Sequence, residues 1–159
     1  MEAFHLDLAT LPAGRSEVSL EAEPTQIGLE PAGWEGPVRG RLVVEKSGDQ
    51  VTVRGQLEAV ANLECVRCLG PARFTLQAPL QVFAERASGR GSAEEAELER
   101  DDYMKFHDGR RLDLREEARE ALLLEMPMTP RCRADCRGLC PHCGADLNQG
   151  PCECAPKAV

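Results

Sequence analysis

The sequence has little of what marks several common protein classes. Among 159 residues it has only four Phe, one Trp and one Tyr, so a hydrophobic core must depend on Val, Leu and Ala. No apolar run approaches the roughly 20 residues that cross a bilayer. The first residues, MEAFHLDLATLPAGRSEV, contain no basic leader followed by a long apolar stretch. These absences predict a cytoplasmic protein without a membrane partner.

An excess of positive charge is also missing, because the formal net charge is −8 at pH 7. Proteins that bind phosphate backbones without sequence preference are usually basic. Any contact with nucleic acid is therefore expected to depend on a local basic patch, and otherwise the partner is a protein.

Catalytic motifs are absent as well. The sequence has no Gly-rich phosphate loop, no G-x-S-x-G and no H-E-x-x-H. Of its three histidines, His5 and His107 stand alone, and His142 lies between Cys140 and Cys143, where it is expected to point away if both cysteines bind a metal. We therefore expect no enzymatic activity, no catalytic residue and no small-molecule substrate.

The strongest periodic pattern lies between Val51 and Cys65, where every odd position is apolar or Gly. This period of two predicts a half-buried strand. Similar alternation over 37–46 and 74–84 predicts an antiparallel meander of three strands, with shorter strands at 4–9 and 16–22 and a loop over 23–37. The middle strand would be about 45 Å long if straight, so we expect a strongly curved, half-barrel-like sheet that bends at Gly55. Pro79 is expected on an edge or at a second bend.

One helix is expected after the strands. Residues 87–102 are small, polar and acidic and predict a flexible excursion. In LDLREEAREALLLEMPMTP (112–130), Asp113 and Glu116 suggest a capping box, and Pro127 ends the apolar periodicity. The fold class is therefore α+β. An antiparallel sheet domain with one packed helix is expected over 1–126, and a Cys-rich, zinc-ribbon-like tail over 127–159.

Cysteine is abundant where other chemistry-bearing residues are scarce, since six of the eight cysteines lie between 132 and 154. Two C-x-x-C turns, CVRC at 65–68 and CPHC at 140–143, have the spacing of a zinc knuckle. In a reducing compartment such clusters more often bind metal than form disulfides. The many Arg and Glu and the two Asn lean toward a thermophile, in which cytosolic disulfides do occur. Disulfides and thiol redox chemistry therefore stay open as alternatives.

Eight thiols can form one or two zinc sites of four sulfurs. The favoured sorting places Cys65, Cys68, Cys132 and Cys136 at one ion and Cys140, Cys143, Cys152 and Cys154 at the other. The alternative pairs Cys132 or Cys136 with the second C-x-x-C turn and leaves the first turn to the last two cysteines. Because a zinc ion held by four thiolates has no open coordination position, zinc is expected to act as a staple.

Arginines lie close to both C-x-x-C turns. They have two interpretations: an RNA-facing patch, or charge balance for a zinc–thiolate site that is formally a dianion. The residues predicted for RNA contact are Arg67, Arg131, Arg133 and Arg137.

The strings LECVRCLGPARF and LREEAREALLLEMPMTPRCRADCRGLCPHCGADLN…CEC resemble the bacterial YceD family, the large ribosomal RNA subunit accumulation proteins. Members are commonly encoded beside a zinc-ribbon ribosomal protein of the large subunit. The resemblance implies a non-enzymatic cytoplasmic factor in ribosome biogenesis, with a ribosomal protein or pre-ribosomal RNA as partner. All eight cysteines would then be candidate ligands. A zinc-ribbon adaptor in transcription, a metal-buffering protein and a redox-sensitive zinc protein are the alternatives.

Overall fold

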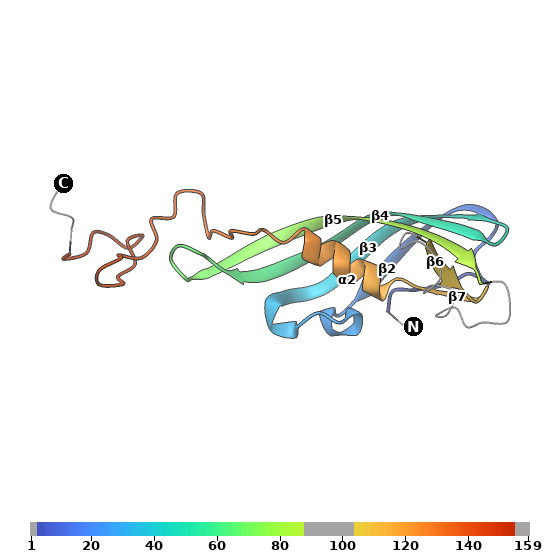
Figure 1. Cartoon of the computed structure of the whole chain (residues 1–159), viewed down its shortest axis with the longest axis horizontal. Coiled ribbons are helices and arrows are strands. Elements are labelled where there is room, and N and C mark those ends of the chain that lie inside the picture. Colours follow the sequence, from blue (N-terminus) through green and yellow to red (C-terminus); the bar gives the residue numbers. More distant parts are fainter. Residues whose placement is uncertain (1–2, 88–103, 155–159) are drawn as a thin grey trace.

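The computed structural model describes residues 3–87 and 104–154. Its main feature is a five-stranded sheet with the order β2-β3-β4-β5-β6. The strands are β2 (Gly14–Ala22), β3 (Trp34–Ser47), β4 (Gln50–Glu64), β5 (Pro71–Arg86) and β6 (Met104–His107). Two short 3-10 helices, η1 (Pro24–Ile27) and η2 (Pro31–Gly33), join β2 to β3. The segment 132–154, which contains six of the cysteines, lies at one end of this sheet (Figure 1).

The expected meander is confirmed, because β3, β4 and β5 follow one another in antiparallel register. The expectation of a wholly antiparallel sheet is wrong, since β6 pairs parallel to β5 from Phe83↔Met104 onward. Parallel pairing needs a long crossover connection, and a strand of four residues has too short a pattern to be recognised. The strands β2 and β6 are the sheet's edges, so it is not closed into a barrel. The half-barrel curvature stays a prediction.

No β-bulge accompanies the bend that was expected at Gly55. The register of β4 runs without a break against β5, and the only shift against β3 lies between Glu35 and Arg39. Gly55 instead allows a close approach of two strands: a Cβ there would lie 2.1 Å from the carbonyl oxygen of Arg41 and 2.8 Å from the Cα of Leu42. Glycine within a strand has this second use, besides bulges. Pro79 is exposed in a part of β5 that pairs only with β4, as expected for an edge position.

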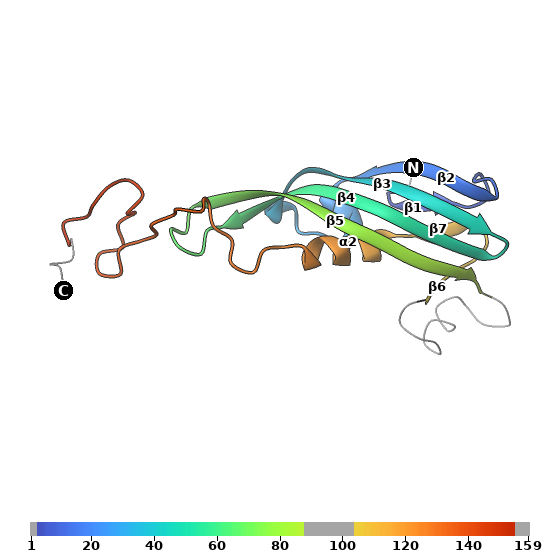
Figure 2. The ribbon, with the colours of Figure 1, turned by 90° about the horizontal axis from the view of Figure 1, so that it is seen from above.

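One face of the sheet forms the core. The odd-numbered residues of β4 and the even-numbered residues of β5 are directed into it, as the alternation predicted. A second, two-stranded sheet of β1 (His5–Asp7) and β7 (Arg111–Asp113) contributes Leu6 and Leu112 to the same core. Figure 2 shows these two strands lying alongside the larger sheet. Trp34 is also buried there, at 8% exposure.

The helix α2 (Arg115–Leu124) packs against β5 and β4 and buries Ala118 and Leu122. It begins one residue later than a cap at Asp113 would give, with Leu114 at the N-cap position. The Asp113 carboxylate nevertheless accepts the backbone N–H of Arg115 at 2.9 Å. After α2 the chain runs along the β4–β5 hairpin and past its tip, and we call residues 127–154 the arm (Figure 1).

The acidic excursion predicted for 87–102 lies outside the described residues, apart from Ala87. The division into domains at 126/127 stays a prediction. Within the described ranges, no helix combines the length and the apolar character needed to cross a membrane.

Candidate metal centres

The first C-x-x-C turn is the tip of the β4–β5 hairpin. Strand pairing continues to Glu64↔Pro71, three residues beyond the last pair between β3 and β4. The six residues that connect the strands close on themselves: Cys65 donates its N–H to the Gly70 carbonyl at 2.8 Å, and Leu69 donates to the Cys65 carbonyl at 3.0 Å. The turn places the sulfurs of Cys65 and Cys68 side by side.

The second C-x-x-C turn repeats this backbone pattern. Cys140 donates its N–H to the Ala145 carbonyl at 2.8 Å, and Gly144 donates to the Cys140 carbonyl at 2.9 Å. Gly144 has a φ of 76°, a conformation that glycine adopts easily. In the first turn the equivalent position is Leu69 rather than Gly70, with a φ of 60°. The two turns, which we call knuckles, therefore share the same backbone hydrogen bonds and the same position of positive φ, with Leu69 in one and Gly144 in the other.

The arm is fastened to the hairpin tip by backbone contacts. Val66 donates its N–H to the Pro130 carbonyl at 2.8 Å, and Leu139 donates to the Arg67 carbonyl at 3.1 Å. Gly138, with a φ of 77°, lies so close that a Cβ would be 3.1 Å from the Arg67 carbonyl oxygen. These contacts bring Cys132 and Cys136 to the hairpin tip.

Two groups of four sulfurs result. Site 1 consists of Cys65, Cys68, Cys132 and Cys136, and site 2 of Cys140, Cys143, Cys152 and Cys154; within each group all sulfurs lie within 4.8 Å of one another. In site 1, the sulfurs of Cys65 and Cys136 are 3.7 Å apart, and those of Cys68 and Cys132 are 3.6 Å apart. These are the two groups of four cysteines that the favoured assignment from the sequence predicted.

The geometry fits a tetrahedral metal ion. Four sulfurs at ~2.3 Å from a zinc ion lie about 3.8 Å from one another, close to the two distances in site 1. A disulfide would need about 2.05 Å, and all eight cysteines are free thiols in the structure. A soft donor set of four sulfurs in a tetrahedron suits zinc or iron rather than magnesium or calcium.

The sulfurs differ in their acidity. Hydrogen bonds from the backbone, first from Cys68, lower the pKa of Cys65 to about 6. Backbone hydrogen bonds from Cys143 and His142 likewise lower the pKa of Cys140 to about 6. The side-chain amide of Asn148 lowers the pKa of Cys136.

The pKa values of neighbouring thiols are shifted upward. Desolvation, followed by the neighbouring sulfurs, raises the pKa of Cys132 to about 12. The adjacent Cys140 raises the pKa of Cys152 to about 11, and Cys143 raises that of Cys154. Four thiolates so close together repel one another, so a divalent cation is needed for all four to ionise.

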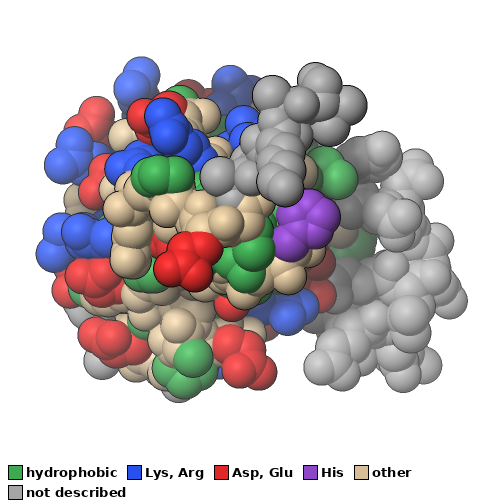
Figure 3. All heavy atoms as spheres, turned by 90° about the vertical axis from the view of Figure 1, so that its left-hand side faces the viewer, with side chains coloured by type: hydrophobic (Ala, Val, Ile, Leu, Met, Phe, Trp, Pro, Cys, Tyr) green, Lys and Arg blue, Asp and Glu red, His purple; other side chains and the backbone are tan. Residues whose placement is uncertain are grey.

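The arginines predicted for RNA contact divide into two pairs. Arg67 donates to the Cys136 carbonyl at 3.2 Å, and Arg133 donates to the Asn148 amide oxygen at 2.8 Å. Arg131 and Arg137 are exposed, and within residues 3–87 and 104–154 their side chains have no hydrogen bond or ion pair. Seen from the arm's end, basic and acidic side chains are interspersed (Figure 3). The RNA contacts stay a prediction.

The histidines are not members of either sulfur group. His107 is buried at 5% exposure, where it bonds the Asp49 carbonyl through Nε2 and accepts the Gly109 N–H at Nδ1. His142 is exposed, and only its backbone N–H contacts a sulfur, that of Cys140 at 3.4 Å. His107 thus has a structural role, in the strand β6 that the sequence did not reveal.

Sequence reasoning missed Asn148. Its side-chain N–H donates to the sulfur of Cys136 at 3.3 Å, although it belongs to the loop between two cysteines of site 2. The signal available in the sequence is its position in ADLNQG, a run of turn-forming residues between Cys143 and Cys152. Such a run predicts a loop, but it does not indicate which sulfur the Asn148 side chain contacts.

The chain matches a family profile and several curated proteins. The profile described as "Large ribosomal RNA subunit accumulation protein YceD" matches residues 53–159. An uncharacterized protein of Mycobacterium tuberculosis is 36% identical over 134 residues, which cover 80% of this chain and 61% of that protein. One of Mycobacterium leprae is 37% identical over 125 residues, covering 77% and 55%.

A plant protein extends the comparison. The "Large ribosomal RNA subunit accumulation protein YCED homolog 1, chloroplastic" of Zea mays is 26% identical over 147 residues, covering 77% of this chain and 50% of that protein. The chain therefore spans between half and about three fifths of the length of these relatives. No solved structure matches the chain.

Proposed function

Because the chain belongs to the YceD family of large ribosomal RNA subunit accumulation proteins, we propose that it supports the accumulation of large-subunit ribosomal RNA during ribosome assembly in the cytoplasm. It acts as a binding factor and not as an enzyme. The observation that carries the proposal is the extent of the family match, which includes β5, α2, the hairpin tip and the whole arm.

Zinc is the ion that the two sites hold in this proposal. Four thiolates leave no coordination position for water or substrate, so each ion is a staple and does not activate a nucleophile. Site 1 joins the hairpin tip to the arm, and site 2 closes the arm on itself. With both ions bound, the arm becomes a fixed extension of the sheet, as a recognition surface requires.

Charge favours a basic ribosomal protein as the direct partner. The chain has a net charge of −8 before any thiol ionises, and each zinc with four thiolates formally adds two negative charges. A phosphate backbone is repelled at long range, whereas a basic protein is attracted. Contacts with pre-ribosomal RNA are then confined to Arg131 and Arg137, whose guanidinium groups have no hydrogen bond or ion pair within the described residues.

The test is depletion of the protein in cells that encode it, followed by measurement of the ratio of large-subunit to small-subunit ribosomal RNA. We expect the ratio to fall and to be restored by the wild-type gene but not by Cys65→Ser with Cys68→Ser. Affinity purification from the same cells is expected to recover ribosomal proteins or precursors. Recovery of RNA polymerase instead, with an unchanged RNA ratio, would favour the adaptor in transcription.

A further inference from the structure

The loop between Cys143 and Cys152 belongs to site 2 by its covalent connections. Both of its ends are ligands of that site, and its start is fixed by the hydrogen bond from Cys140 to the Ala145 carbonyl. The middle of the loop lies against the segment between the two sites: Leu147 donates its N–H to the Gly138 carbonyl at 2.9 Å, and Asp146 forms a β-bridge with Leu139.

Asn148, in this loop, contacts site 1. Its Nδ2 donates to the sulfur of Cys136 at 3.3 Å. Its Oδ1 accepts two hydrogen bonds, from the Arg133 guanidinium at 2.8 Å and from the backbone N–H of Arg137 at 2.9 Å. Its own N–H donates to the Asp146 carboxylate at 2.9 Å.

The chemistry fixes the orientation of the Asn148 amide. Two donors, Arg133 and Arg137, point at one end of the side chain, so this end must be the oxygen and the other end the NH2 group. The NH2 group is thereby directed at the sulfur of Cys136, a site 1 ligand. A hydrogen bond to a thiolate stabilises its charge, and such supporting contacts orient metal ligands.

We propose that Asn148 is a positioning residue that couples the two metal sites, so that filling site 2 strengthens metal binding at site 1. An ion at site 2 fixes both ends of the 143–152 loop, which reduces the conformational freedom of Asn148. The amide then meets Cys136 at a lower entropic cost. The coupling is reciprocal, so an ion at site 1 also favours binding at site 2.

The inference rests on the proposal that both sites hold metal, and the test uses the full-length chain. The reduced, metal-free protein is titrated with Co²⁺ against a competing chelator, and thiolate-to-cobalt absorption is assigned to each site with cysteine variants. We compare four proteins: wild type, Asn148→Leu, a site 2 variant with Cys143→Ser and Cys154→Ser, and the combination. Gln149→Leu, a substitution at the exposed neighbour, is the matched control.

Loss of site 2 is expected to weaken Co²⁺ binding at site 1 by about 10-fold, and Asn148→Leu by about 10- to 100-fold, the range for residues that support metal ligands. The combination is expected to be no weaker than Asn148→Leu alone, because both changes remove the same contact. Gln149→Leu should match the wild type. The absorption of site 1 should move to lower energy in Asn148→Leu, since the thiolate loses a hydrogen bond.

Asn148→Asp guards against misfolding of the leucine variant, because it keeps the acceptor for Arg133 and Arg137 and replaces the donor to sulfur by a carboxylate oxygen, whose charge also repels the thiolate. It should show the same shift in absorption and weaker binding at site 1. The coupling is overturned if site 1 binds Co²⁺ equally well with site 2 removed, or if the effects of the two changes multiply. If the wild type binds no metal, both the coupling and the zinc proposal fail; if it binds two ions and Asn148→Leu changes nothing, only the coupling fails.

Discussion

Leu69 and Gly144 hold the same position in the two knuckles. Each follows the second cysteine of its turn, has a positive φ of 60° and 76°, and donates its N–H to the carbonyl of the first cysteine. A positive φ is easy for glycine and costs other residues about 1–2 kcal/mol. The first knuckle therefore contains backbone strain that the second avoids.

This comparison gives opposite expectations for two substitutions. Gly144→Leu should weaken site 2 by about 1 kcal/mol, which is between five- and tenfold in metal affinity. Leu69→Gly should leave site 1 equal or slightly tighter, because relief of strain is partly offset by the greater freedom of glycine when unfolded. Chelator competition on each variant measures both. A loss of metal affinity in Leu69→Gly would mean that the Leu69 side chain, 57% exposed, has a packing role.

Gly55→Ala tests the close approach of β3 and β4. The new Cβ would lie 2.1 Å from the Arg41 carbonyl oxygen and 2.8 Å from the Leu42 Cα, so the strands must separate. We expect a loss of about 3 kcal/mol or more in the free energy of unfolding, measured by urea denaturation. Gly33→Ala is the matched control, because nothing lies within 4 Å of a Cβ there; equal stability of the two variants would contradict the proximity of β3.

The sequence was sufficient for features that repeat along the chain. The alternation from Val51 to Cys65 predicted β4 to within a residue, and the order of the cysteines along the chain favoured, over one alternative, the two groups of sulfurs that the structure shows. The close approach at Gly55 was not predicted, because a glycine in a strand has two uses, a bulge and a close approach, and only the position of β3 distinguishes them. Asn148 was missed because its contact with Cys136 depends on how the arm folds back.

Metal removal should free the arm while the sheet stays folded. The larger hydrophobic core is made mainly by the strands and α2 and contains none of the eight cysteines, whereas Cys65 and Cys136 are buried with Ala72 in a separate small cluster. The arm itself is fastened by sulfurs and a few backbone hydrogen bonds. We expect trypsin to cleave after Arg131, Arg133 or Arg137 only after treatment with a strong chelator, with little change in circular dichroism. Acidification should act like the chelator, because protons compete with metal for thiolates. Rapid cleavage of the metal-loaded protein would contradict a fixed arm.

The turn between β6 and β7 gives a pH dependence with a defined sign. Backbone N–H groups of Arg111 and Arg110, each 2.8 Å from Asp108 Oδ1, lower the pKa of this carboxyl. A depressed pKa contributes stability above the unfolded value of about 3.9, and the contribution is lost as the pH falls through the lower folded value. Asp108→Asn should therefore be less stable than the wild type at pH 7, by less than about 1 kcal/mol for so exposed a group. The difference should vanish once the pH lies below the folded pKa; a constant difference would contradict a charge effect.

The arginines near the sites should separate into a structural and a contacting pair. Arg67→Ala removes the hydrogen bond to the Cys136 carbonyl, so we expect weaker metal binding at site 1 and easier proteolysis of the arm. Arg131→Ala with Arg137→Ala removes exposed guanidinium groups that have no hydrogen bond or ion pair within the described residues, and metal content should be unchanged. If these two residues contact RNA, the double variant binds ribosomal RNA fragments more weakly, and the salt dependence of log K falls by about one unit per lost phosphate contact.

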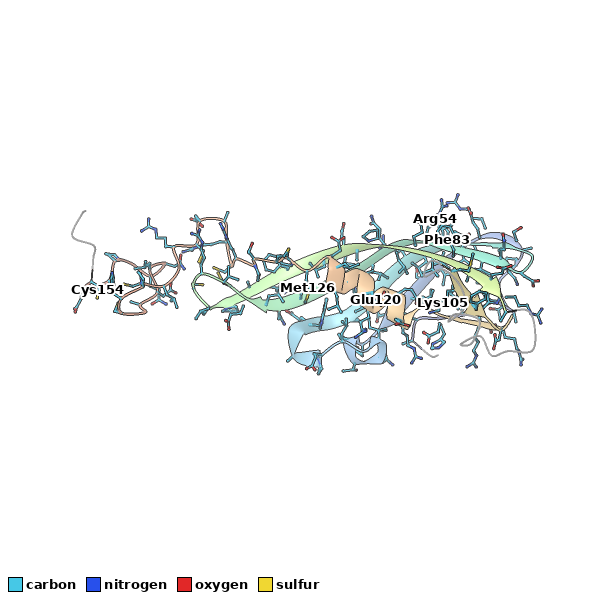
Figure 4. The ribbon with its side chains drawn as sticks, in the orientation of Figure 1. Arg54, Phe83, Lys105, Glu120, Met126 and Cys154 are labelled. Atoms are coloured by element: carbon cyan, nitrogen blue, oxygen red, sulfur yellow. The ribbon has the colours of Figure 1, made fainter. Side chains whose placement is uncertain are left out.

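Arg54→Ala, on the exposed face of β4 (Figure 4), is the control for a general loss of positive charge. Equal weakening by Arg54→Ala would assign RNA binding to overall charge, and no weakening by either variant would leave a ribosomal protein as the direct partner.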